Sequence, residues 1–221
     1  LGTALLADPE RWQRGCEYLR IAARGLRDRG PALYIQIAKA HEKQVDQAGL
    51  WRNYHLALQL GRALGVKNLS SDDQLSLYAV VKLLGDHAFK TGDLDTALDA
   101  FKFYSTYEKA GVETYRTLAE LFERKGDTWM ALNCTEHALA YPGAAADPDL
   151  TVRKDKYYYS VTPEELKARW EQVHKWFDLN YCLEKTRFIL ERYNGELDNL
   201  DWAGHLVSLA RTGMAAASKE R

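Results

Sequence analysis

Hydrophobic residues recur every three or four positions through most of this chain, which is the spacing of helices that bury one face. Near the start, Asp8-Pro9-Glu10 combines a capping acid with a first-turn proline, and this combination predicts a helix start. The buried stripe of this helix is predicted to consist of Leu19, Ala22, Ala23 and Leu26. Gly30-Pro31 is expected to end it and to begin a second helix that reaches about Ala48.

A third helix is predicted over residues 50–64, and Gly65 is expected to end it. Its apolar face is predicted to carry Leu56, Leu60 and Leu64. Ser71-Asp72-Asp73 then opens a run of four further helices that continues to about Tyr141. The first 141 residues are therefore predicted to be helical almost throughout.

The helical period stops after this run. Residues 142–148 contain two prolines and are expected to be a loop. Residues 149–161 show no helical period, so a packed loop is expected over 143–161, with a short strand through Tyr157–Tyr159 as the alternative. Thr162-Pro163-Glu164-Glu165 has the residues of a capping box, and C-terminal helices are predicted over residues 162–213.

Two dipeptides in the middle of the chain repeat at a fixed distance. Gly92-Asp93 recurs as Gly126-Asp127, 34 residues later, and Leu84-Gly85 recurs as Leu118-Ala119 at the same interval. Further matched positions are Ala88 with Phe122, Ala97 with Ala131, and Tyr104 with Ala138. A glycine can end a helix in the left-handed conformation, and the following aspartate can cap the next helix. A period of this length predicts an array of helical hairpins.

These matched residues resemble the tetratricopeptide repeat over residues 78–142. The resemblance implies an all-α fold, an alpha-alpha superhelix or solenoid of antiparallel helical hairpins, and a single domain over residues 1–221. The expected parts are N-terminal helices in 1–65, two clear repeats in 72–142, the long loop in 143–161 and C-terminal helices in 162–213. Members of this family act as protein-interaction scaffolds, so the resemblance also implies protein binding.

The repeat pattern weakens towards both ends. Gly195-Glu196-Leu197-Asp198 echoes residues 92–95, but Phe188 stands where a small residue is expected, so a divergent hairpin is predicted there. Near the start, Gly49-Leu50 is followed by three residues at the spacings of Ala97, Phe101 and Tyr104. These three residues are Tyr54, Leu58 and Gly61. A third repeat and an ordinary helical hairpin both stay open there.

The resemblance also implies a binding groove lined by the first helix of each repeat. The groove residues it implies are Lys82, Asp86, Phe89, Lys90, Arg116, Glu120, Glu123 and Arg124, with Ala79 and Glu113 at the margins. Family members that bind a C-terminal carboxylate use an amide where this chain has Asp86 and Glu120. Two acids there would repel a carboxylate, so that type of ligand is not expected.

Charge adds a modest constraint on partners. The net charge is −1, which argues against nucleic acid as the main partner. Residues 1–65 are net basic, whereas residues 66–150 are net acidic, and this imbalance favours a partner with basic residues. No stretch approaches the length of a transmembrane helix, so no membrane partner is expected. The chain starts at Leu1 rather than Met, and a fragment of a longer protein is one open interpretation.

Candidate chemistry is sparse. Cys16, Cys134 and Cys182 are interpreted as buried thiols in a reducing, cytoplasmic setting. Cys134 and His137 stand one helical turn apart, as do Glu171 and His174, but neither pair has the further ligands that a metal site needs. No cofactor, metal or catalytic residue is therefore predicted, and the chain is not expected to be an enzyme.

Two alternatives to partner binding stay open. One is a homo-oligomerisation module in which Trp202 and Leu206 are covered by a second copy. The other is a helical enzyme of unrecognised type that depends on His137 or His174.

Overall fold

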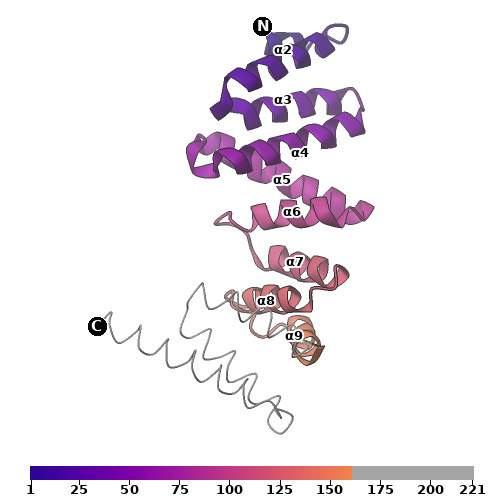
Figure 1. The fold of residues 1–221 in the computed structure, drawn as a ribbon, viewed down its shortest axis with the longest axis vertical. Coiled ribbons are helices and arrows are strands. Elements are labelled where there is room, and N and C mark those ends of the chain that lie inside the picture. Colours follow the sequence, from indigo (N-terminus) through magenta and orange to yellow (C-terminus); the bar gives the residue numbers. More distant parts are fainter. Residues whose placement is uncertain (161–221) are drawn as a thin grey trace, which may run out of the picture. The chain divides into compact units, whose positions relative to one another are not determined.

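The computed structural model describes residues 1–160, which form one compact unit (Figure 1). Every regular element within these residues is a helix, and this part of the chain contains no strand. The all-α class predicted from the sequence is therefore confirmed for the described residues. The helices predicted over residues 162–213, the Gly195–Asp198 hairpin, Cys182, His174, Trp202 and Leu206 lie outside them.

Three of the predicted helices are present in the first 65 residues. The elements are α1 (Gly2–Leu5), α2 (Trp12–Gly25), a 3₁₀ turn (Arg27–Arg29), α3 (Gly30–Lys43) and α4 (Gln47–Leu64). Helix α2 starts later than predicted, because the Asp8 carboxylate accepts hydrogen bonds from the Glu10 amide and the Arg11 side chain within a preceding turn. Leu26 lies beyond α2 and is 53% exposed, so its predicted place in the buried stripe was wrong.

The four helices predicted for the middle of the chain are confirmed. They are α5 (Ser71–Thr91), α6 (Leu94–Tyr104), α7 (Val112–Arg124) and α8 (Thr128–Leu139), and a 3₁₀ turn (Val66–Asn68) precedes them. The cap of α5 is Ser70, whose hydroxyl accepts the Asp73 amide at 3.2 Å. Gly92 ends α5 with φ of 82°, as the sequence predicted.

The loop predicted over residues 143–161 is wrong for most of its length, because Pro148–Ser160 form helix α9. Asp147 precedes the helix, and its carboxylate accepts the amides of Asp149 and Leu150. Pro148 occupies the first turn, where its missing N–H costs nothing. Leu150 and Tyr157 are both buried and stand seven residues apart, two turns of one helical face. Only these two apolar positions carry the period, which is why the sequence pattern was too weak to reveal it.

Consecutive helices pack against one another, and the tightest pairs are α3 with α4, α5 with α6 and α7 with α8 (Figure 1). Each pair is a helical hairpin. Helix α3 also contacts α5, so the first helices of two successive hairpins lie against each other. The main core runs through the first two of these pairs, from Ile35 and Leu58 to Leu77, Leu84 and Phe103.

A glycine permits the close approach of α5 to α6. A Cβ atom built on Gly85 would lie 3.0 Å from Phe101 Cε2 and 3.2 Å from Ala100 Cβ. Contacts this short are tighter than nine in ten contacts of real Cβ atoms, so Phe101 or Ala100 would have to shift by a few tenths of an ångström. The small residue predicted at this position is therefore required by the packing of its own hairpin.

Candidate functional site

The turn inside a hairpin has the same structure in both predicted repeats. In the first, the Asp93 carboxylate accepts the Thr96 amide at 3.1 Å, while the Asp93 amide donates to the Ala88 carbonyl at 2.9 Å. In the second, the Asp127 carboxylate accepts the Met130 amide at 3.1 Å, and the Asp127 amide donates to the Phe122 carbonyl at 2.9 Å. The preceding Gly92 and Gly126 have φ of 82° and 76°. In both turns the glycine therefore takes the left-handed conformation and the aspartate caps the next helix, as the sequence predicted.

A third copy of this turn joins α3 to α4. The Asp46 carboxylate accepts the Gly49 amide at 2.9 Å, and the Asp46 amide donates to the His41 carbonyl at 2.9 Å. Val45 takes the glycine position and has a φ of 58°. The weak match found in the sequence was therefore shifted, because Leu50, and not Tyr54, is equivalent to Ala97.

Two features hid this third turn from sequence comparison. Val45 replaces the glycine, and Asp46 precedes Asp93 by 47 residues rather than 34 because α4 is longer than α6 and α5 is longer than α7. One signal was present: Ile37-Ala38 stands eight residues before Asp46, as Leu84-Gly85 stands before Asp93. The three turns together show which positions of α3, α5 and α7 are equivalent.

This equivalence extends the predicted groove to α3. Lys39 corresponds to Asp86 on α5, and Lys43 corresponds to Lys90. We define the first-helix face as the set of equivalent and neighbouring positions on these three helices that are exposed or half-buried. Its residues are Lys39, Lys43, Leu75, Ala79, Lys82, Leu83, Asp86, Phe89, Lys90, Glu120 and Arg124.

The predicted groove residues of α5 and part of α7 lie together. Lys82 and Asp86 form an ion pair at 2.8 Å, and Arg124 and Glu120 form another at 2.6 Å. The Arg124 guanidinium lies 4.5 Å from the centre of the Phe89 ring, which connects α7 to α5. Lys90 is exposed beside Phe89. These contacts give a mixed-charge surface with one aromatic ring.

Two predicted groove residues of α7 instead contact α9 and the segment before it. Arg116 pairs with Asp147 at 2.6 Å and with Asp149 at 3.3 Å. Glu123 accepts hydrogen bonds from the Lys156 ammonium and the Tyr157 hydroxyl. These contacts hold α9 against α7, so both side chains already have partners within the chain.

The ionisation of these groups follows from the same contacts. Burial raises the pKa of Glu123, but the hydrogen bonds from Lys156 and Tyr157 outweigh it and leave that pKa below its usual value. The backbone amide of Leu150, assisted by Arg116, lowers the pKa of the Asp147 carboxyl. Burial and the adjacent Glu123 raise the pKa of Tyr157. All three groups therefore keep the charge state that docks α9.

The sequence reasoning missed two apolar residues on α5. Leu75 and Leu83 are 50% and 52% exposed, although leucines on the opposite side of the same helix are buried. Ala79 lies midway between them, and the four-residue steps place all three on one side of the helix. The sequence did contain a signal, because Leu75 and Leu83 do not fall on the helical face that the buried residues of α5 share.

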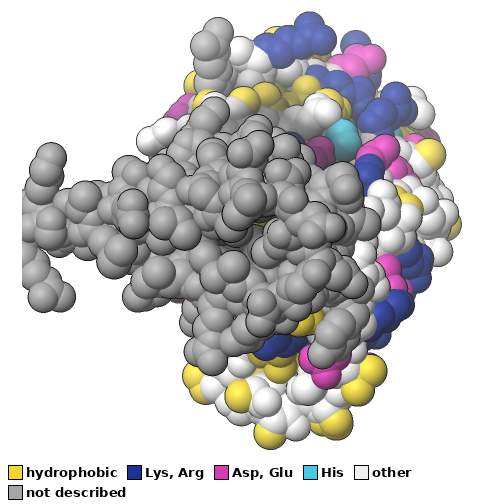
Figure 2. All heavy atoms as spheres, turned by 60° about the horizontal axis from the view of Figure 1, so that its bottom comes forward, with side chains coloured by type: hydrophobic (Ala, Val, Ile, Leu, Met, Phe, Trp, Pro, Cys, Tyr) yellow, Lys and Arg dark blue, Asp and Glu magenta, His cyan; other side chains and the backbone are white. Residues whose placement is uncertain are grey.

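The acidic balance of residues 66–150 does not produce an acidic patch among the described side chains. Asp93, Asp127 and Asp147 cap helices, and other acids pair with basic residues. These additional pairs are Asp73 with Arg29, Asp95 with Lys125 and Asp99 with Arg62. Basic and acidic side chains alternate where the surface of the described part is visible (Figure 2).

Three lysines of the first-helix face differ from their neighbours. Within residues 1–160, no ion pair involves Lys39, Lys43 or Lys90. The uncompensated charge of this face is therefore positive. This finding weakens the expectation of a partner with basic residues.

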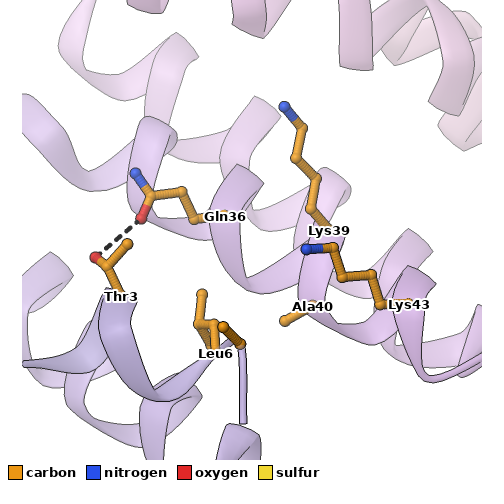
Figure 3. A pocket seen from close by; sticks show the side chains of 7 residues that line it. Thr3, Leu6, Gln36, Lys39, Ala40 and Lys43 are labelled. Carbon is orange, nitrogen blue, oxygen red and sulfur yellow. Dashed lines mark hydrogen bonds between the residues drawn. The ribbon is translucent and has the colours of Figure 1, made fainter. Parts of the chain in front are cut away.

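A pocket of about 220 Å³ lies between α1 and α3 (Figure 3). Leu6, Ala7 and Ala40 supply apolar contact, and the Thr3 hydroxyl lies 3.5 Å from the Gln36 side-chain oxygen at one edge. Lys39 and Lys43 also line the pocket, and Figure 3 shows both extending from the same side of α3. The pocket thus lies at the α3 end of the first-helix face.

Candidate catalytic and metal-binding groups are not gathered in the described residues. No group of three histidine, cysteine or acidic side chains within residues 1–160 is placed to hold a metal ion. Burial raises the pKa of the Cys134 thiol to about 12, so it stays protonated at neutral pH. His137 stacks against Tyr115 with ring centres 5.4 Å apart. None of the helices α1–α9 is long and apolar enough to cross a membrane.

Comparison with known proteins adds no relative: no protein-family model and no curated protein matches the chain.

Proposed function

We propose that the chain is a solenoid of tetratricopeptide-like hairpins that binds a segment of another protein along the first-helix face. The observation that carries this proposal is the threefold repetition of the hairpin turn at Asp46, Asp93 and Asp127. Equal turns place equivalent positions of α3, α5 and α7 on the same side of their hairpins. A row of equivalent positions is the arrangement that lets a helical array contact an extended partner at several points.

The chemistry of the face supports a peptide rather than a small substrate. Leu75, Leu83 and the half-buried Phe89 offer apolar contact along α5. Lysines and paired charges surround this apolar strip. Apolar anchors with a polar surround are typical of protein-binding surfaces.

The test is a peptide selection against the immobilised protein, followed by affinity measurement on the selected peptides. A Leu83→Glu, Lys90→Glu variant changes two exposed residues of the face without breaking an ion pair among residues 1–160. The matched control is Ile21→Glu, Lys109→Glu, which changes an exposed apolar residue and an exposed lysine elsewhere. We expect at least a tenfold loss of affinity in the first variant, about 1.4 kcal/mol, and no loss in the control. Equal affinity in both variants would contradict the proposal.

Homo-oligomerisation and enzymatic activity stay alternatives. The first was based on Trp202 and Leu206, which lie outside the described residues. The second was based partly on His137, which contacts an aromatic ring. No contact in residues 1–160 favours either function over peptide binding.

A further inference from the structure

We infer that the pocket between α1 and α3 takes an acidic side chain of the bound segment, with its carboxylate held by Lys39 and Lys43. This inference rests on the proposed function and names the kind of partner, an acidic peptide. It reverses the preference for a basic partner that the charge balance of the sequence favoured.

The first argument is the difference between equivalent positions. On α5 the position of Lys39 is occupied by Asp86, which pairs with Lys82. On α7 it is occupied by Glu120, which pairs with Arg124. Each of these helices therefore neutralises its own charge at this point.

Helix α3 forms no such ion pair: Glu42 stands three residues after Lys39, but no ion pair within residues 1–160 involves Glu42, Lys39 or Lys43. Lys39 and Lys43 stand one turn apart, so their like charges repel each other. The position one turn before Lys39 is Ile35, which is 3% exposed and carries no charge. An external carboxylate between the two ammonium groups would relieve this repulsion and gain two charge-assisted hydrogen bonds.

The second argument is the pocket beside these lysines. Its volume of about 220 Å³ suits one side chain and is smaller than the usual cavity for a drug-sized ligand. Leu6 and Ala40 present apolar surface below the lysines (Figure 3). The two methylene groups of a glutamate fit that surface, while its carboxylate reaches the lysines.

The test uses a probe whose only charge is the side-chain carboxylate, N-acetyl-glutamate N-methylamide. The uncharged analogue N-acetyl-glutamine N-methylamide is the matched control, and inorganic phosphate is a second probe. Binding is followed by the NMR signals of the Leu6 and Ala40 methyl groups and the ε-carbons of Lys39 and Lys43. We expect saturable shifts with the glutamate probe, a dissociation constant of roughly 1–10 mM, and weaker binding at high salt.

The variants separate this inference from the proposed function. Lys39→Gln, Lys43→Gln should abolish the shifts at Leu6 and Ala40, whereas Lys82→Gln, Lys90→Gln should retain them. The Leu83→Glu, Lys90→Glu variant should lose peptide binding but still bind the glutamate probe. Absence of shifts with the glutamate probe, equal shifts with the glutamine analogue, or shifts with phosphate alone would each overturn the inference. Peptide binding that persists in such a case would leave the proposed function intact.

Discussion

The hydroxyl of Tyr157 on α9 donates a hydrogen bond to the carboxylate of Glu123 on α7, across 34 residues of sequence. That separation equals the step between the two Gly-Asp turns. Helix α9 thus contacts α7 as the first helix of a following hairpin would, although the sequence predicted a loop there. The bond lies in a partly buried site, where a charged acceptor makes it stronger than a neutral one.

Removing this hydroxyl should destabilise the described unit. Tyr157→Phe leaves the buried ring in place but deprives Glu123 of one donor, so we expect a loss of about 1–2 kcal/mol in the free energy of unfolding. Urea denaturation followed by circular dichroism measures the change. Tyr18→Phe, on the exposed side of α2, is the control and should change stability little. Equal stability of the two variants would show that the contact does not dock α9.

Replacing Val45 by glycine should stabilise the protein. Val45 has a φ of 58°, in the left-handed region that a β-branched residue adopts only at a cost, and it is 79% exposed. Val45→Gly relieves the strain without losing buried surface, and we expect a gain of about 1 kcal/mol. The converse change, Gly92→Val, should destabilise by at least as much. A destabilising Val45→Gly would contradict the equivalence of the three turns.

Adding one methyl group at Gly85 should destabilise the hairpin of α5 and α6. The new Cβ would meet Phe101 and Ala100 at 3.0 to 3.2 Å, and we expect the overpacking cost of about 1–3 kcal/mol to exceed the roughly 1 kcal/mol that alanine gains over glycine inside a helix. Gly25→Ala is the matched control, because no atom lies within 4 Å of a Cβ at that position and alanine favours helix. Thermal unfolding should show a lower melting temperature for Gly85→Ala only. An unchanged melting temperature would mean that the hairpin packs more loosely than described.

The capping aspartates predict a loss of stability in acid. Hydrogen bonds from Thr96 lower the folded-state pKa of Asp93 below its usual value of 3.8. A lowered pKa adds stability above the unfolded-state pKa, and this contribution is lost as pH falls through the folded-state pKa. Asp93→Asn still caps the helix but does not titrate. Its stability relative to the wild type should therefore improve as the pH falls below about 4, as measured by urea denaturation across pH. A constant difference between the two proteins would rule out the titration of this cap.

The sequence predicted the hairpins best where a glycine occupies the left-handed backbone conformation of the turn. Gly92 and Gly126 marked their turns because glycine takes a positive φ without strain. Val45 makes the same turn, but its side chain carries no such signal, so the third hairpin was placed one helical turn too late. Helix α9 was missed for a related reason, since only Leu150 and Tyr157 carry its buried face.

The binding role of the predicted site residues stays a prediction, but the structure shows which contacts these residues make within the chain. The family pattern identifies the helix side on which a residue stands, and Phe89, Glu120 and Arg124 do lie together. The family pattern does not include α9, which the sequence did not reveal. The contacts of Arg116 and Glu123 with α9 and the segment before it were therefore missed. Which charged side chains stay unpaired on the surface depends on these ion pairs, so it could not be predicted from the net charge of a segment.

The central claim is that a protein segment binds along the first-helix face, and photo-crosslinking tests it most directly. A photoreactive amino acid placed at Leu83, between the apolar and charged parts of the face, should crosslink to a selected peptide. The same amino acid at Ile21, which is also exposed and lies on α2, should not. Crosslinking at Leu83 alone is the result predicted here. Crosslinking at Ile21 with none at Leu83 would contradict the claim and place the binding surface elsewhere on the protein.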